Sequence, residues 1–210
     1  YAFLLVGSDQ VWNSQWNHND MAYYLDFAPL SKKYSYAASL GTSNHDAFSA
    51  KRLADHLSSF RRLSVREKSA ADLISPLVAN EVSTHVDPTL LLDKTEWLKI
   101  THKIVEKPYL LIYTLENDPS LIDKAIAIAD ERKLEIIQIK DVFRPTKGRI
   151  KYASCVAPEH FVSLFSQAAF IVTNSFHGLA FATIFEKDFI VSPQKRQGAP
   201  NDRLFDFIAK

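Results

Sequence analysis

The feature that most constrains the fold is a series of short, continuous apolar runs that each end in a polar turn. Residues 1–6 run into Gly7-Ser8-Asp9, and residues 109–115 and 170–173 end in a similar way. Continuous rather than alternating apolarity is typical of strands covered on both faces, as in a parallel sheet. Helical spacing or a turn follows each run, and this rhythm predicts βαβ units in an open α/β sheet.

The rhythm occurs twice along the chain. Strands are predicted at 2–6, 34–41, 63–67, 82–86, 109–115, 135–139, 170–173 and 188–191, and helices at 46–60, 68–77, 121–132, 158–168 and 178–185. The charged stretch 93–107 predicts a connection, with a short helix, between the two halves. We therefore predict an α/β protein of two Rossmann-like domains facing a cleft, at residues 1–95 and 96–210. Because the chain opens inside an apolar strand, we expect the N-terminal part of the first domain to be missing.

Composition excludes several classes of function. The 210 residues carry a net charge of +1, so nothing in the overall charge points to nucleic acid or an anionic membrane. A single cysteine, Cys155, cannot form an intramolecular disulfide and suits a reducing compartment, so we expect a cytoplasmic protein. No apolar run approaches the roughly 20 residues of a spanning helix, and no signal peptide is visible. The histidines lack metal-ligand spacing, and phosphate-binding glycine loops are absent, so no metal or cofactor is expected.

The segment Thr173-Asn174-Ser175-Phe176-His177-Gly178 is the strongest candidate site. A buried strand enters a polar turn and a helix begins near Gly178, so the helix N-terminus offers an anion site. Asn174 and Ser175 lie in that turn, and Gly178 allows a ligand or another backbone to come close. His177 would donate to a phosphate or transfer a proton near neutral pH. The alternative is that Asn174 and Ser175 only cap the helix while His177 satisfies a backbone carbonyl.

Two further strand ends carry candidate residues. Arg66 lies near the end of the strand 63–67, just before a helix, where a guanidinium would grip a carboxylate or phosphate. Alternatively, it is a surface residue paired with Glu67 or Asp72. Ser8 and Asp9 follow the first strand and would contact a sugar, with Trp12 or Trp16 covering its ring. The alternative is that Asp9 caps a turn and Trp12 belongs to the core.

Seven segments together resemble the polysaccharide pyruvyl transferase family. They are Gly7-Ser8-Asp9-Gln10-Val11-Trp12-Asn13, Tyr24-Leu25-Asp26-Phe27, Tyr36-Ala37-Ala38-Ser39-Leu40-Gly41, Leu63-Ser64-Val65-Arg66-Glu67-Lys68-Ser69, Val86-Asp87-Pro88-Thr89-Leu90-Leu91, Thr173-Asn174-Ser175-Phe176-His177-Gly178 and Asn201-Asp202-Arg203-Leu204. The resemblance spans nearly the whole chain. It implies a fold like the two-domain GT-B glycosyltransferases, with an acceptor-side first domain and a donor-side second domain. It also implies transfer of a pyruvyl group from phosphoenolpyruvate to two hydroxyls of a sugar, giving a cyclic ketal.

The resemblance also implies roles for single residues. Arg66 matches a family arginine that holds the donor, and His177 matches the family histidine. Our own hypothesis for the mechanism is that Asp9 orients the acceptor sugar, so that Asp9 and His177 are the expected catalytic residues. Ser175 stands where well-understood members carry a donor-binding arginine, so a second cation is expected from Lys195, Arg196 or Arg203.

The expected partners are phosphoenolpyruvate and an acceptor sugar carried by a nucleotide, a lipid or a polymer. No nucleic acid and no membrane span are expected, although association with the polysaccharide machinery at the membrane surface is compatible with this function. Two alternatives stay open: a GT-B-type glycosyltransferase that uses a nucleotide-sugar, and a catalytically inactive glycan-binding homologue.

Overall fold

The computed structural model describes residues 1–18, 20–42, 47–104, 106–140, 148–196, 199 and 201–208. The chain divides into two compact units: unit 1 consists of Tyr1–Leu91 and Lys195–Lys210, and unit 2 of Leu92–Gln194. The first boundary lies close to the predicted one at 95/96. The C-terminal segment differs from the prediction, because it returns to unit 1 rather than completing the second domain.

Unit 2 is built on a parallel sheet with strand order β7-β6-β5-β8-β9 among the described residues. Its elements are α4 (Lys94–Leu98), β5 (Tyr109–Tyr113), α5 (Pro119–Arg132), β6 (Glu135–Lys140), β7 (Ile150–Ser154), α6 (Pro158–Gln167), β8 (Phe170–Thr173), α7 (Phe176–Ile184) and β9 (Phe189–Val191). The sheet starts in its middle at β5, grows outward through β6 and β7, and then returns to the other side of β5 for β8 and β9. This is the doubly wound order, in which the direction of winding reverses between β5 and β8.

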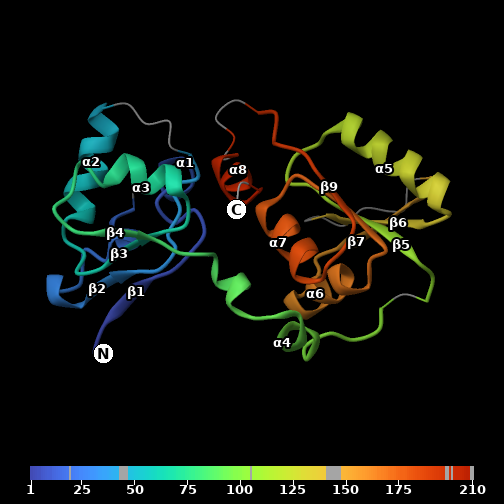
Figure 1. Ribbon diagram of the computed structural model, residues 1–210, viewed down its shortest axis with the longest axis horizontal. Helices are drawn as coiled ribbons and strands as arrows, with labels where there is room; N and C mark the ends of the chain where they lie inside the picture. Colours follow the sequence, from blue (N-terminus) through green and yellow to red (C-terminus); the bar gives the residue numbers. More distant parts are fainter. Residues whose placement is uncertain are drawn as a thin grey trace. The chain divides into compact units, whose positions relative to one another are not determined.

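Helices cover both faces of the unit 2 sheet (Figure 1). Leu121, Ala125 and Ala129 of α5 pack against one face. Phe165 of α6 and Phe181 of α7 pack against the other. Burial on both faces is the reason that β5 and β8 are continuously apolar, as the sequence predicted.

Unit 1 also contains parallel strands, with β1 paired to β2 and β3 paired to β4. Its elements are β1 (Leu4–Val6), α1 (Ser14–Asn17), η1 (Met21–Tyr24), η2 (Leu30–Lys32), β2 (Lys33–Ser35), α2 (Ala47–Leu57), β3 (Leu63–Val65), α3 (Lys68–Ile74), β4 (Val82–Thr84), η3 (Pro88–Leu91) and α8 (Asp202–Ile208). Single bridges, such as Ala38 to Val65, connect the two strand pairs. The protein is therefore mixed α/β with parallel sheets.

Several elements differ from the prediction, and strands β3 and β4 end two residues earlier than predicted, at Val65 and Thr84. The strand at 34–41 is shorter, because Ala37 has a positive φ of 48° and breaks the regular ladder after Ser35. Strand β7 was not predicted, since it is a polar edge strand with an exposed Lys151. Helix α7 begins at Phe176 rather than at Gly178. Asp46, the predicted start of the helix 46–60, lies outside the described residues.

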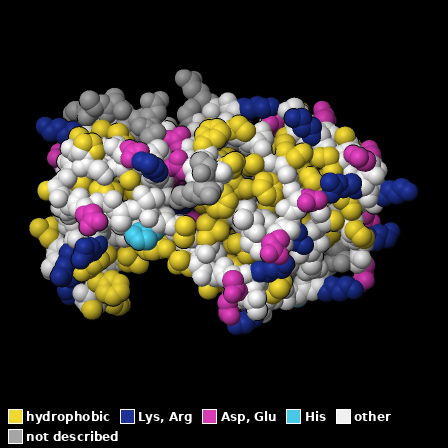
Figure 2. Space-filling model, in the orientation of Figure 1, with side chains coloured by type: hydrophobic (Ala, Val, Ile, Leu, Met, Phe, Trp, Pro, Cys, Tyr) yellow, Lys and Arg dark blue, Asp and Glu magenta, His cyan; other side chains and the backbone are white. Residues whose placement is uncertain are grey.

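On the face shown in Figure 2, basic and acidic side chains are interspersed. Among the described residues, we find no helix with both the length and the apolarity needed to cross a membrane.

Candidate functional site

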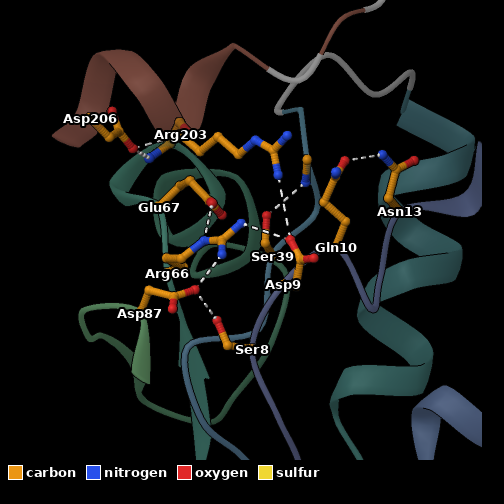
Figure 3. Close-up of polar contacts among 12 residues, drawn as sticks. Ser8, Asp9, Gln10, Asn13, Ser39, Arg66, Glu67, Asp87, Arg203 and Asp206 are labelled. Carbon is orange, nitrogen blue, oxygen red and sulfur yellow. Dashed lines mark hydrogen bonds and ion pairs between the residues drawn. The ribbon is translucent and has the colours of Figure 1, made fainter. Parts of the chain in front are cut away.

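The carboxyl ends of the unit 1 strands bring five charged or hydroxyl side chains together (Figure 3). Ser8 and Asp9 follow β1, Arg66 and Glu67 follow β3, and Asp87 follows β4. Parallel strands end at one edge of their sheet, which explains why residues so far apart in sequence meet there. We call this group the Arg66 cluster.

Arg66 lies at the centre of this cluster and is 4% exposed. Its Nε donates to Glu67 at 2.9 Å, its Nη1 to Asp87 at 2.5 Å and its Nη2 to Asp9 at 3.4 Å. Burial alone lowers the pKa of Arg66, but Glu67 and Asp87 outweigh burial and raise it above its usual value. Arg66 does pair with Glu67, as the alternative proposed, but it does so in the interior. Three protein carboxylates engage the guanidinium, and this geometry favours a positioning role over the predicted donor clamp.

Asp9 is the exposed member of the cluster. Its side chain is 56% exposed, and its φ of 62° turns the chain sharply after β1. Its Oδ1 accepts from Arg66 and also from Arg203 of α8, each at 3.4 Å. Burial, followed by repulsion from Arg66, lowers the pKa of Arg203 below its usual value. Two buried cations therefore anchor a carboxylate that reaches solvent.

Ser8 supports the Arg66 cluster through a hydrogen bond to Asp87. Its Oγ donates to Asp87 Oδ2 at 2.7 Å, while Asp87 Oδ1 accepts from the amide and the hydroxyl of Thr89. Ser8 thus links β1 to the turn after β4. The Ser8 hydroxyl thus has a hydrogen-bond partner within the protein and does not need the predicted acceptor sugar as one.

An open pocket of about 280 Å³ adjoins Asp9. It is lined by Asp9, Gln10, Val11, Trp16, Asn17 and Tyr23. Trp16 is 56% and Tyr23 41% exposed, so aromatic surface is available there. The guanidinium of Arg196 lies 5.3 Å from the centre of the Trp16 ring. Asn17 is buried and its Nδ2 donates to the Val11 carbonyl at 2.7 Å, so its amide is used within the protein. The Asp9 carboxylate and the Gln10 amide can bind hydroxyl groups, and the aromatic surface beside them can cover an apolar ring face, which suits a sugar.

Trp12 does not line this pocket and lies in the core. It is 1% exposed, stacks on Tyr24, meets Phe60 edge to face and donates its Nε1–H to the Tyr23 carbonyl at 3.0 Å. The predicted acceptor-binding role of Trp12 is therefore corrected in favour of the core alternative. Trp16, four positions later, is the exposed tryptophan that lines the pocket.

In unit 2, the segment 173–178 forms the turn from β8 into α7. The Ser175 hydroxyl accepts from the Gly178 amide at 3.4 Å and so caps the helix. A Cβ at Gly178 would collide with Thr173 Oγ1, so the glycine allows α7 to pack closely on β8. Gly178 therefore serves the close approach of two protein elements, and the space that a ligand was predicted to use is filled by Thr173.

Asn174 and His177 differ in exposure. Asn174 is fully buried; its Oδ1 accepts the Leu115 amide at 2.7 Å, and its carbonyl accepts from Gln194 at 3.2 Å. His177 lies in the first turn of α7, is partly exposed and meets the Phe176 ring edge to face at 5.3 Å. His177 can therefore reach a ligand, whereas Ser175 is buried as the helix cap.

A family model described as polysaccharide pyruvyl transferase matches residues 1–193. The chain belongs to the polysaccharide pyruvyl transferase family. No curated protein matches it in sequence. One solved structure with similarity is the bacterial iron-containing dodecameric glycosyltransferase TibC from enterotoxigenic E. coli H10407, at 13% identity and a TM-score of 0.35. That comparison covers 75% of this chain and 42% of TibC, so the chain spans less than half the length of that structure.

Within this pyruvyl transferase family member, the structure assigns the predicted residues to two separate groups. Asp9 and Arg66 belong to unit 1, together with the candidate cations Lys195, Arg196 and Arg203. Asn174, Ser175, His177 and Gly178 belong to unit 2. Among the described residues, no group of three or more His, Cys, Asp or Glu side chains is arranged to hold a metal ion.

Sequence reasoning did not single out Asp87, Gln10, Asn17 or Tyr23 as members of a site. The useful signal was that Asp87 closely follows a predicted strand, as Asp9 and Arg66 do, and so shares their edge of the sheet.

Proposed function

We propose that this protein transfers a pyruvyl group from phosphoenolpyruvate to two hydroxyls of a sugar in a surface or exopolysaccharide precursor. The observation that carries the proposal is the exposed Asp9 carboxylate. In a chain of this family, it is held by two buried arginines beside an aromatic-lined pocket. This arrangement supports sugar binding at Asp9.

The reaction forms two C–O bonds at C2 of the donor. A first sugar hydroxyl adds to C2, the electron pair of the C2–C3 double bond takes a proton at C3, and a base accepts the hydroxyl proton. A second hydroxyl then attacks C2 and displaces phosphate, and its proton leaves with the phosphate, giving the cyclic ketal and inorganic phosphate. The protein must therefore supply a base, a proton donor and hydrogen bonds to the departing phosphate.

Asp9 is our candidate base for an acceptor hydroxyl. Its Oδ1 is anchored by Arg66 and Arg203, which fixes the orientation of the carboxyl group without enclosing it. Trp16 and Tyr23 would cover one face of the acceptor ring, and the amide of Gln10 would bind its hydroxyls. The acceptor sugar would be carried by a nucleotide, a lipid or a growing polymer.

His177 is our candidate proton donor and phosphate ligand. It is partly exposed at the positive end of α7, where a phosphate is favoured. Neither role for His177 requires the arginine that Ser175 replaces.

The test is incubation of the full-length protein with phosphoenolpyruvate and a panel of nucleotide-linked and free sugars. We expect release of inorganic phosphate together with a new ketal methyl resonance in the proton NMR spectrum. His177→Gln should lower turnover by about 10²–10⁴-fold, whereas His160→Gln in α6 should not. A loss below about tenfold would remove the catalytic role of His177.

A glycosyltransferase would give a different result. Calorimetric titration should then show binding of a nucleotide-sugar and none of phosphoenolpyruvate, and sugar transfer would occur without a ketal. Sugar binding with no turnover of either donor would instead favour an inactive glycan-binding protein.

A further inference from the structure

The point in unit 2 where the winding of the sheet reverses lies between β5 and β8. Tyr113 pairs with Thr173 as the last residue pair of these neighbouring strands. Thr114 and Asn174 come next, so they lie side by side just beyond the carboxyl ends of the two strands. Open α/β sheets bind their ligands at this position.

Both residues bury a polar atom that has no hydrogen-bond partner in the described part of the chain. These atoms are Thr114 Oγ1 and Asn174 Nδ2. Thr114 is 9% exposed and Asn174 fully buried. Buried polar groups are nearly always hydrogen-bonded, so two exceptions on adjacent strand ends need an explanation.

The orientation of the Asn174 amide is fixed by its other contacts. Its Oδ1 accepts the Leu115 amide at 2.7 Å, so rotating the side chain to satisfy Nδ2 would break that bond. Asn174 also directly precedes Ser175, the N-cap of α7. An unpartnered N–H₂ group is thus held at the N-terminus of a buried, nine-residue helix.

We propose that Thr114 and Asn174 form an oxyanion subsite at the β5–β8 switch point. The amide Nδ2 donates, the threonine hydroxyl is able to donate, and the positive end of α7 favours negative charge on the acceptor. A phosphate or carboxylate oxygen is the ligand group that satisfies all three. This inference rests on the proposed function, because it assigns the subsite to the phosphate or carboxylate of the donor.

The subsite also gives a physical account of Ser175. A buried anion can be held by neutral donors and a helix dipole in place of a guanidinium, because hydrogen bonds to a charged acceptor are strong where water is excluded. The subsite can therefore bind the anionic group of phosphoenolpyruvate without a cation from Lys195, Arg196 or Arg203.

Two near-isosteric variants test the subsite. Thr114→Val removes the unpartnered hydroxyl, and Asn174→Asp keeps the oxygen that accepts from Leu115 while replacing the donor with an oxygen. The matched control is Ser154→Ala, which removes another unpartnered buried hydroxyl at the end of the edge strand β7. Each full-length variant would be titrated calorimetrically with inorganic phosphate, phosphoenolpyruvate and pyruvate, and its unfolding temperature measured without ligand.

We expect Thr114→Val and Asn174→Asp to weaken binding of phosphate or phosphoenolpyruvate by roughly tenfold or more, and Ser154→Ala to leave it unchanged. Weakened pyruvate binding in place of weakened phosphate binding would identify the carboxylate as the occupant. Thr114→Val should unfold at the wild-type temperature or above, because it removes a buried group without a partner. Its loss of affinity would then not reflect misfolding.

Two outcomes would overturn the proposal: a wild-type protein that binds none of the three anions, or a Thr114→Val variant with wild-type affinity for all of them. The proposed function can fail separately. If the anions bind through Thr114 and no ketal forms with any sugar, the subsite stands and pyruvyl transfer does not.

Discussion

At the scale of single residues, the Arg66 cluster shows how a buried charge is used for position. A buried ion pair adds little net stability compared with apolar packing, but removal of one partner leaves the others unneutralised. Arg66 engages Glu67, Asp87 and Asp9 from three separate strand ends. Arg66 therefore serves to fix the geometry at the carboxyl ends of the unit 1 strands.

We predict that Arg66→Met destabilises the protein by about 3–5 kcal/mol, because Glu67 and Asp87 would stay buried without their cation. The matched control is Lys94→Met, which removes the exposed pair with Glu186 and should cost less than about 1 kcal/mol. Urea unfolding followed by circular dichroism would measure both. Equal effects of the two substitutions would contradict the positioning role.

Alanine substitutions of Trp12 and Trp16 should have different effects on stability and on sugar binding. Trp12→Ala should lower stability by about 3–5 kcal/mol, because it empties a core position between Tyr24 and Phe60. Trp16→Ala should change stability by less than about 0.5 kcal/mol, since its side chain is exposed, but should raise the KM for the acceptor sugar. Unfolding curves and acceptor saturation would separate them. An unchanged acceptor KM in Trp16→Ala would exclude the pocket as the sugar site.

At the scale of elements, the contact of α7 with β8 depends on Gly178. We predict that Gly178→Ala costs about 1–3 kcal/mol, because the new methyl group would collide with the Thr173 side chain. Gly7→Ala is the control, since nothing lies within 4 Å of a Cβ at that position. Combining Gly178→Ala with Thr173→Ala should cost less than the sum of the two single changes. Strict additivity in such a double-mutant cycle would show that the two side chains do not compete for space.

At the scale of the whole molecule, the chain leaves unit 1 after Leu91 and re-enters it at Lys195. Helix α8 then contributes Arg203 to Asp9, Asp206 to the Ser69 hydroxyl and amide, and a buried Leu204. The sequence predicted one domain boundary, at 95/96, and did not predict that the chain returns to unit 1.

Truncation after Asn201 should therefore loosen unit 1 and leave unit 2 intact. Hydrogen exchange would show faster exchange in α3 and β3, with β5, β6 and β8 unchanged. Phe205→Ala, which removes an exposed side chain of the same helix, should leave both units protected. Loss of protection in β5 and β8 after the truncation would mean that α8 supports unit 2 instead.

The sequence alone determined strands such as β5 and β8, because a continuous apolar run is stable in a sheet that is buried on both faces. The polar edge strand β7 carries no such run and was not predicted. The sequence also located polar strand ends at Asp9 and Arg66 in unit 1 and at Asn174 in unit 2, since parallel strands of one sheet end at the same edge. Only the tertiary structure decided what those ends contact. Arg66 meets Asp9 from 57 residues away, and Arg203 meets Asp9 from 194 residues away. The choice of Trp16 over Trp12, the packing role of Gly178 and the unpartnered atoms of Thr114 and Asn174 depend on burial and on neighbours distant in sequence. Local pattern records which side chains are present, whereas the competition among them for space and hydrogen bonds is settled only when the chain is folded.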